Sequence, residues 1–357
     1  FYERPALYWK KGAHNTERTH NQKFATKMTA IANSESTSDL AQSHSRPPQL
    51  LTPLDDVHQF WSKRWEGPKL GWHLHDVNPH LLKYTDILIG RNGSQIDAAK
   101  DGIRIFVPLC GKSVDLASLA SHSEVSHVVG IDIVRNAAEE FANEHPQFFL
   151  EEVKFCDENL VDSFGSDSKE KMTKSEDGEN CGFESHDGRN SNNKSISQMS
   201  TFYGNRISIV NGDLFQFLAM ERQERTKYIS KYDADEQKHH LFDAIYDRAS
   251  IVAIDPSLHL EYVTSMGKII RPGGIMLLIT IEKRRTLNEE AKTDGPPFSI
   301  DESQVRALYE SQPWVEYVTL LEEVDDLITE EAKERWQKKG VLELYDLVFV
   351  IKAKDVF

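Results

Sequence analysis

Residues 103–132 read IRIFVPLCGKSVDLASLASHSEVSHVVGID and carry the pattern of an α/β protein. The parts are an apolar run, a tight loop, a helical stretch and a second apolar run, at 103–107, 108–112, 113 to about 120 and 127–131. Such a strand–loop–helix–strand unit builds a parallel sheet, with a ligand loop at the carboxyl end of its first strand. Asp132 ends the second run, 21 residues after Gly111. That spacing suits a carboxylate at a strand tip that accepts hydrogen bonds from ribose hydroxyls.

The loop favours a nucleoside without phosphates over a dinucleotide. A dinucleotide site needs several glycines so that the backbone can approach a pyrophosphate, and this loop has only Gly111. A nicotinamide dehydrogenase is therefore disfavoured. S-adenosylmethionine needs less, namely one small residue beside its methionine part and an acid for its ribose. The alternative is a plain strand–helix–strand piece without a ligand.

Composition narrows the class of protein. The chain has 357 residues, of which 39% are hydrophobic, so it can form a packed core. The formal charge of −15 argues against a nucleic-acid partner. The three cysteines contain no C-x-x-C pair, which favours a reducing, cytoplasmic compartment over a disulfide scaffold. No apolar run approaches the roughly 20 residues of a membrane span, and we expect no membrane partner.

Two polar segments stand apart from the rest. Residues 1–52 lack a sustained period and predict an unstructured tail. Basic residues outnumber acidic ones there and the first residue is Phe1, so the alternative is the remnant of an organelle transit peptide. Residues 157 to about 203 are rich in Ser, Asn, Asp, Glu, Lys and Gly and predict a disordered insertion. We expect it to interrupt a single domain at 53–357.

Tryptophans mark the start of that domain. Val57, Trp61 and Trp65 are spaced four residues apart, on one face of a helix. Trp72 follows shortly, and a second helix is expected to open at Asn78, with that residue as its cap. Packing in the core is one explanation of the tryptophans. The other is an aromatic lid over a ligand, since a cationic sulfonium is attracted to the face of an indole ring.

The remaining strands continue the α/β pattern. They are expected at 206–210, 242–247, 275–281, 314–324 and 342–353. Asp213 follows the first of these and is well placed to accept from an adenine amino group. Arg248 follows the second, at the rim where open α/β sheets bind ligands. The last two strands, joined by a short charged helix, indicate an antiparallel edge on an otherwise parallel sheet.

Several motifs together resemble the thiopurine S-methyltransferase family of class I S-adenosylmethionine-dependent methyltransferases, and its bacterial branch in particular. They are FWSKRW at 60–65 with GWH at 71–73, VNPHL at 77–81, FVPLCGKS at 106–113, VGID at 129–132, YDRA at 246–249 and GPPF at 295–298. The resemblance covers about Val57 to Ala353. It implies a single Rossmann-like domain, in which a seven-stranded, mostly parallel sheet with an antiparallel edge strand has helices on both faces.

The resemblance also implies roles for individual residues. Those expected to bind S-adenosyl-L-methionine are Trp61 and Trp65 over it, Trp72 beside both it and the acceptor, Leu109 and Gly111 at its methionine part, Asp132 at its ribose, and Asp213 and Leu214 at its adenine. The family often has Glu in place of Asp132. Arg248 would line the acceptor side and the cofactor site, and Arg335, by its distance ahead of Gly340, matches a second acceptor-side arginine.

The implied reaction is in-line methyl transfer to a thiol of the thiopurine or aromatic type, or to a selenol, with S-adenosyl-L-homocysteine as product. Alignment of donor and acceptor and exclusion of water are the main tasks. Arg248 would favour the thiolate because it stays charged. Its alternative is a structural salt bridge with Asp247 or Asp243. Cys110 is interpreted as a small loop residue, and no metal site is expected.

Three functions remain open on the sequence. The first is a thiol or selenol S-methyltransferase, acting as a monomer on a small molecule. The second is a methyltransferase of the same fold for halide, thiocyanate or metalloid anions. The third is an inactive cofactor-binding protein that works through its insertion as an interaction module; the complete set of tryptophan, loop, Asp132 and Arg248 motifs speaks against it.

Overall fold

The computed structural model describes residues 54–67, 72–90, 102–155, 199–229 and 241–356, with only the backbone for 54–56. The predicted tail at 1–52 lies outside these ranges. So does the predicted insertion, except for its last residues.

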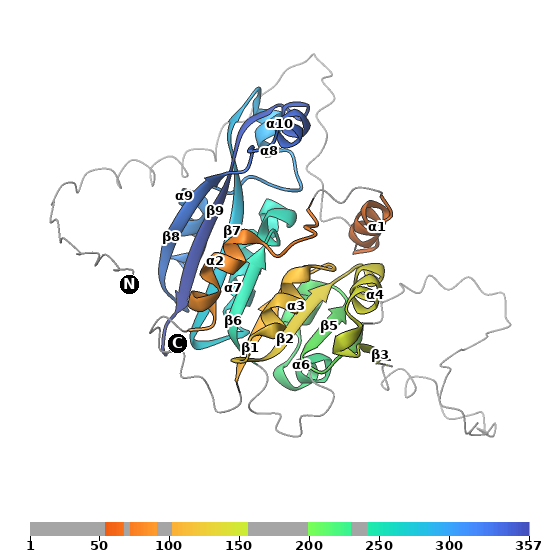
Figure 1. The fold of residues 1–357 in the computed structure, drawn as a ribbon. Helices are drawn as coiled ribbons and strands as arrows, with labels where there is room; N and C mark the ends of the chain where they lie inside the picture. Colours follow the sequence, from red (N-terminus) through yellow and green to blue (C-terminus); the bar gives the residue numbers. More distant parts are fainter. Residues whose placement is uncertain (1–53, 68–71, 91–101, 156–198, 230–240, 357) are drawn as a thin grey trace, which may run out of the picture. The chain divides into compact units, whose positions relative to one another are not determined.

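One sheet organises the described part of the chain, and its strands run in the order β3-β4-β5-β2-β1-β6-β7-β9-β8 (Figure 1). The strands are β1 Ile103–Val107, β2 Val125–Asp132, β3 Glu151–Lys154, β4 Ser200–Tyr203, β5 Ile207–Asn211, β6 Phe242–Arg248, β7 Ile270–Thr286, β8 Val315–Asp325 and β9 Val341–Ala353. The five central strands from β5 to β7 are parallel. The predicted α/β class with a mostly parallel sheet is confirmed.

The number of strands differs from the seven expected, because β3 and β4 add an antiparallel pair beside β5. Strand β4 falls at the end of the segment expected to be disordered. That boundary was wrong, since Phe202 and Tyr203 are buried and Ser200 pairs with Asn211 of β5. At the other end of the sheet, the two closing strands β8 and β9 form the expected antiparallel edge, because β9 is antiparallel to both β7 and β8.

Helices cover both faces of the sheet. They are α1 Leu54–Trp65, α2 Pro79–Leu88, α3 Val114–Ser121, α4 Arg135–Glu144, α5 Leu214–Ala219, α6 Arg222–Ile229, α7 His259–Met266, α8 Glu289–Thr293, α9 Glu302–Tyr309 and α10 Glu330–Gln337. Buried side chains of α2, α3 and α4 form one hydrophobic cluster with the sheet. Those of α5, α6, α7 and α9 form another. Such a two-sided cover explains why β1 is buried at all five positions.

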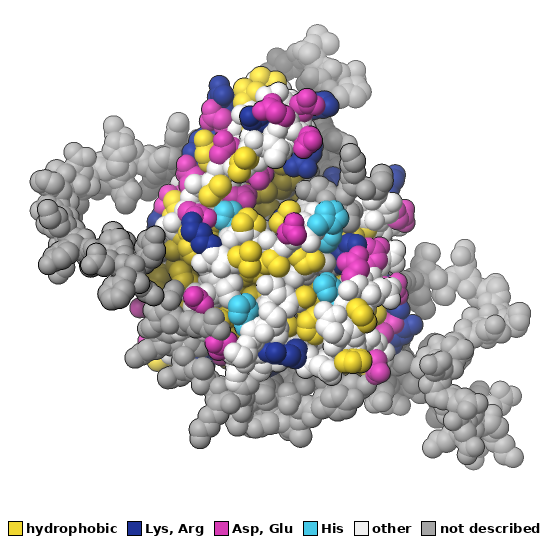
Figure 2. Space-filling view, viewed as in Figure 1, with side chains coloured by type: hydrophobic (Ala, Val, Ile, Leu, Met, Phe, Trp, Pro, Cys, Tyr) yellow, Lys and Arg dark blue, Asp and Glu magenta, His cyan; other side chains and the backbone are white. Residues whose placement is uncertain are grey.

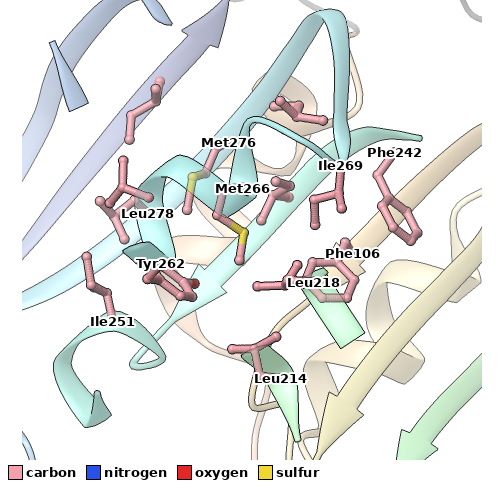
Figure 3. Close-up of a cluster of buried hydrophobic side chains, with 14 of the residues drawn as sticks. Phe106, Leu214, Leu218, Phe242, Ile251, Tyr262, Met266, Ile269, Met276 and Leu278 are labelled. Atoms are coloured by element: carbon pink, nitrogen blue, oxygen red, sulfur yellow. The ribbon is translucent and has the colours of Figure 1, made fainter. Parts of the chain in front are cut away.

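The larger cluster is the main core. Figure 3 shows Phe106 of β1 beside Leu214 and Leu218 of α5, with Tyr262 and Met266 of α7 close by. These side chains are almost fully buried. Burying a large apolar side chain contributes roughly 1.5–3 kcal/mol, so this cluster holds the sheet and α5 in a fixed relation.

Local signals set several helix starts. The side chain of Asn78 accepts from the backbone N–H groups of His80 and Leu81, so Asn78 is the cap of α2, as predicted. Asp301 and Gln304 form a reciprocal capping box at the start of α9. Among the described residues, no helix is long and apolar enough to cross a membrane.

Candidate active site

The carboxyl ends of the parallel strands bring the predicted loops to one rim. Strand pairing sets Val107 of β1 beside Gly130 of β2, and Asp132 beside Asn211 of β5. The Oγ of Ser250, just after β6, donates to the carbonyl oxygen of Pro108, 2.7 Å away. This bond ties the loop after β6 to the loop after β1.

Both tied loops have strained backbone. Leu109 and Ala249 have φ angles of 42° and 66°, in the left-handed region that side chains with a Cβ rarely adopt. Each such residue costs about 1 kcal/mol, and strain of this kind gathers at functional sites. Gly111, with φ of 52°, adopts the same region without a Cβ penalty.

Asp132 is held at the tip of β2 by the backbone. Its Oδ2 accepts from the N–H of Gly111 at 2.9 Å, and its Oδ1 accepts from the N–H of Val134 at 2.8 Å. Burial raises the pKa of this carboxyl to about 6, against the effect of those backbone N–H groups. Each oxygen keeps an acceptor position, since a carboxylate offers about four.

The three tryptophans form one cluster, of which Trp65 touches the loop after β1. The indole rings of Trp61 and Trp72 meet edge to face with centroids 5.7 Å apart, and those of Trp65 and Trp72 with centroids 6.1 Å apart. Trp65 also lies against Gly111. All three rings are partly exposed, so they do not belong to the buried core. They form an aromatic cover beside the rim.

Strand β6 directs two charged side chains to different environments. Asp247 is fully buried, accepts from Tyr262 at 2.6 Å, and has its pKa raised by burial to about 6. Arg248, the next residue, donates from Nη1 to the backbone carbonyl of Trp72 at 2.7 Å. Asp243 pairs with Arg271. Asp247 and Asp243 were the two acids with which Arg248 could form a structural salt bridge. Both of them thus have other partners.

Asp213 and Leu214, the two residues expected at the adenine, lie at the start of α5. Asp213 caps α5, and its Oδ1 accepts from the N–H of Gln216 at 2.7 Å. Leu214 is only 3% exposed, and its side chain points into the main core (Figure 3). The side chain of Leu214 is thus part of the main core.

Arg335 lies on α10, where its charge acts on the pKa of a carboxyl that the sequence did not single out. This residue is Asp326, in the loop between β8 and α10. Burial and Asp346 raise the pKa of Asp326 to about 6, whereas Arg335 and Arg248 lower it. Two strands and a helix thus bring both arginines within electrostatic reach of one carboxylate. The only local signal was the pair of acids, Asp325 and Asp326, at the end of a strand.

The surroundings of Cys110, His73 and His75 can be described in the same way. Cys110 is buried, and its pKa is raised well above the ordinary value by burial, so the thiol is neutral at neutral pH. The rings of His73 and His75 meet edge to face, 5.4 Å between centroids. In the described ranges, no group of three or more His, Cys, Asp or Glu side chains is arranged to hold a metal ion.

Comparison with known proteins agrees with this geometry. The family model described as thiopurine S-methyltransferase matches residues 57–164 and 182–354. A thiopurine S-methyltransferase of Shewanella woodyi is 30% identical over 249 residues, covering 70% of this chain and 79% of that protein. A probable thiopurine S-methyltransferase of Yarrowia lipolytica is 28% identical over 278 residues, covering 77% and 94%.

Among solved structures, a 1,6-didemethyltoxoflavin-N1-methyltransferase of Burkholderia thailandensis is similar over 87% of this chain and 94% of that chain. The TM-score is 0.43 and the identity 12%. The family match covers well over half of the chain and includes the loop with Gly111, the tip of β2 and the end of β6. The chain therefore belongs to the thiopurine S-methyltransferase family and is a methyltransferase.

Proposed function

We propose that this methyltransferase uses S-adenosylmethionine to methylate the sulfur of a small thiol, of the thiopurine or aromatic type, or the selenium of a selenol. The observation that carries the proposal is the arrangement at the rim. A buried carboxylate, a loop with one glycine, three aromatic rings and an arginine adjoin one another there.

The residues present fit the proposed cofactor. Asp132 has spare acceptor positions for ribose hydroxyls while two backbone N–H groups fix its orientation. Trp65 and Trp72 provide aromatic surface beside Gly111, which suits a sulfonium cation. Asp213 and Leu214 lie at the start of α5, just after β5, the next strand of the rim, and would flank the adenine.

The chain's own residues would prepare the acceptor. When bound, the cofactor supplies the methyl group, which bonds to the acceptor sulfur as its bond to the sulfonium breaks. Arg248 keeps a positive charge at the rim and favours the thiolate form of the acceptor. Its bond to the Trp72 carbonyl sets the position of that charge. The aromatic cover excludes water, which strengthens these electrostatic interactions.

Transfer of a labelled methyl group from S-adenosylmethionine tests the proposal. Thiophenol, a thiopurine, iodide and selenite serve as parallel acceptors, with the wild type, Asp132→Ala and Asp255→Ala. Asp255 is a matched control, because its Oδ1 also accepts from a backbone N–H two residues ahead, on an exposed turn. We expect methylation of the thiols, lost in Asp132→Ala and kept in Asp255→Ala. Methylation of the inorganic anions alone would contradict the choice of acceptor.

A further inference from the structure

The segment from Trp72 to Asn78 leads from the aromatic cover to α2 and is held at its two ends. At one end, the carbonyl oxygen of Trp72 accepts from Arg248 at 2.7 Å. At the other end, the backbone N–H of Asn78 donates to Oδ1 of Asp115 at 2.8 Å. In between, residues 73–77 make no hydrogen bond to any residue that the structure describes, and 74–76 are exposed. Figure 2 shows this face of the molecule, where histidine side chains stand beside hydrophobic and acidic ones.

The anchor at Asn78 is part of a buried hydrogen-bond network. Asp115 lies in the first turn of α3 and is 2% exposed. Its Oδ2 accepts from the hydroxyl of Tyr246 in β6 at 3.0 Å. Burial, and then the charge of Asp115, raise the pKa of Tyr246 well above its ordinary value, so the hydroxyl keeps its proton and remains a donor. Asp115 thus joins the start of α2 to the central strand β6 at a place that water does not reach.

Both ends of the segment depend on the same face of β6. Side chains two residues apart in a strand point to the same face, as Tyr246 and Arg248 do. Asp247 lies between them and points to the opposite face, where it accepts from Tyr262 of α7. One face of β6 therefore holds Trp72 directly, through Arg248, and holds the other end of the segment through Asp115.

We infer that Asp115 is a positioning residue, which holds residues 72–78 on β6 so that Trp72 and Arg248 keep their places at the acceptor side. This inference rests on the proposed function, in which Arg248 faces the acceptor. Without Asp115, only the Trp72 carbonyl would tie the segment to β6, and the guanidinium would lose a fixed partner. Asp115 itself touches neither substrate, so its effect on the reaction passes through Arg248.

A purely structural role of Asp115 makes a different prediction. If Asp115 only stabilised the fold, its loss would lower the free energy of unfolding and would reduce turnover by the same factor whatever residue stands at position 248. If it acts through Arg248, the two substitutions are coupled, because the second removes an interaction that the first has already disturbed. The coupling between the two positions is therefore the informative quantity.

The experiment measures kcat/KM for thiophenol with S-adenosylmethionine, well below the thermal midpoint of every variant. Asp115→Ala and Tyr246→Phe are compared in the wild-type and Arg248→Lys backgrounds. Tyr309→Phe is the matched control, because Tyr309 is equally buried and its hydroxyl has no hydrogen-bond partner among the described residues.

We expect Asp115→Ala to lower kcat/KM about tenfold in the wild-type background, the scale of one buried hydrogen bond. In the Arg248→Lys background the further loss should stay below about threefold. Tyr246→Phe should show the same coupling with a smaller loss, since Asp115 still binds Asn78 in that variant. Tyr309→Phe should keep the wild-type value in both backgrounds.

Hydrogen exchange of residues 72–78, followed by mass spectrometry, tests the same inference without an activity assay. Exchange in this segment should be faster in Asp115→Ala than in the wild type and unchanged in Tyr309→Phe. Asp115→Asn should restore slow exchange and most of the lost turnover. Its amide oxygen can accept from Asn78, and its amide N–H can donate to the Tyr246 hydroxyl. Recovery in Asp115→Asn would assign the effect to hydrogen bonds and not to charge.

The outcomes separate the two proposals. Equal losses of kcat/KM in both backgrounds, or unchanged exchange of residues 72–78 in Asp115→Ala, overturn the positioning role and leave the proposed function intact. If the wild type methylates iodide or selenite but no thiol, the proposed function fails, and hydrogen exchange together with the same comparison on iodide decides the role of Asp115. If Asp115→Ala does not fold, Tyr246→Phe replaces it in both measurements.

Discussion

The indole ring of Trp65 lies directly on Gly111. A Cβ added to Gly111 would be 2.7 Å from Cζ2 of that ring and 3.0 Å from Cη2. Helix α1 and the loop after β1 are therefore in contact through a residue that has no side chain. The same residue donates its N–H to Asp132, so one glycine joins the aromatic cover to the buried carboxylate.

Replacement of Gly111 by alanine should disturb both contacts. Its φ of 52° costs about 1 kcal/mol for a residue with a Cβ, and the new methyl group would displace Trp65. We expect a lower free energy of unfolding and at least tenfold weaker binding of S-adenosylhomocysteine, measured by denaturation and calorimetry. In the background of Trp65→Ala the loss of stability should be smaller, because the collision is gone. Equal losses in both backgrounds would contradict the contact.

Cofactor affinity should depend on the protonation of Asp132. Burial raises its pKa to about 6, and ribose hydroxyls donate to the ionised form. The affinity for S-adenosylhomocysteine should therefore be constant above that value and fall by up to about tenfold per pH unit below it. Calorimetry between pH 5 and pH 8 measures this. A similar fall in Asp132→Asn would assign the dependence to another group.

His80 should make the free energy of unfolding depend on pH. Its contribution should fall as pH rises, whereas that of a salt-bridged acid falls as pH is lowered. Its Nδ1 lies 2.7 Å from Glu322 and its Nε2 lies 3.3 Å from Asp346, so both nitrogens carry protons. The hydrogen bond to Asp346, and then that to Glu322, raise its pKa. The stabilisation is complete below the ordinary pKa of about 6.5 and is lost as pH rises through the raised value.

We therefore expect the wild type to exceed His80→Gln in free energy of unfolding by about 1 kcal/mol more at pH 6 than at pH 9. Urea denaturation at the two pH values measures the difference. His122→Gln, at a partly exposed position, is the control and should show no such change. A larger gap at pH 9 would show that His80 is held neutral.

Replacement of Arg248 by lysine should lower turnover although the charge remains. A guanidinium can donate to the Trp72 carbonyl and present further N–H groups to an acceptor, whereas an ammonium is a point charge. With thiophenol we expect kcat to fall about tenfold or more, with little change in the KM for S-adenosylmethionine. Arg284→Lys, whose native side chain pairs with Glu282 and Glu323, should keep the wild-type rate.

Much of the rim could be predicted because its signals are local. An apolar run predicted β1 at the residues where it lies, and an acid after the next run predicted the tip of β2. The cap at Asn78 depends on two neighbouring N–H groups. The burial of the Leu214 side chain could not be predicted in this way, because the direction of that side chain depends on how α5 packs on the sheet.

Elements that depend on distant pairing were missed for the same reason. Strand β3 is short and largely exposed, so it has no clear alternation, and β4 follows a polar segment. Strand β7 continues to Thr286 through charged residues, because β9 pairs with it along its length and Arg285 meets Glu343 at 2.8 Å.

The register of the first four strands has a consequence for how this chain can vary in length. Lys154 pairs with Ser200, Ser200 with Asn211, and Asn211 with Asp132, so one row joins four neighbouring strands. The residues between 154 and 200 therefore leave and re-enter the sheet at adjacent positions. Each doubling in the number of residues joining such a pair costs only about 0.6 kcal/mol of loop-closure entropy. The number of residues between 154 and 200 can therefore change in evolution without moving the Asp132 carboxylate at the other end of the row.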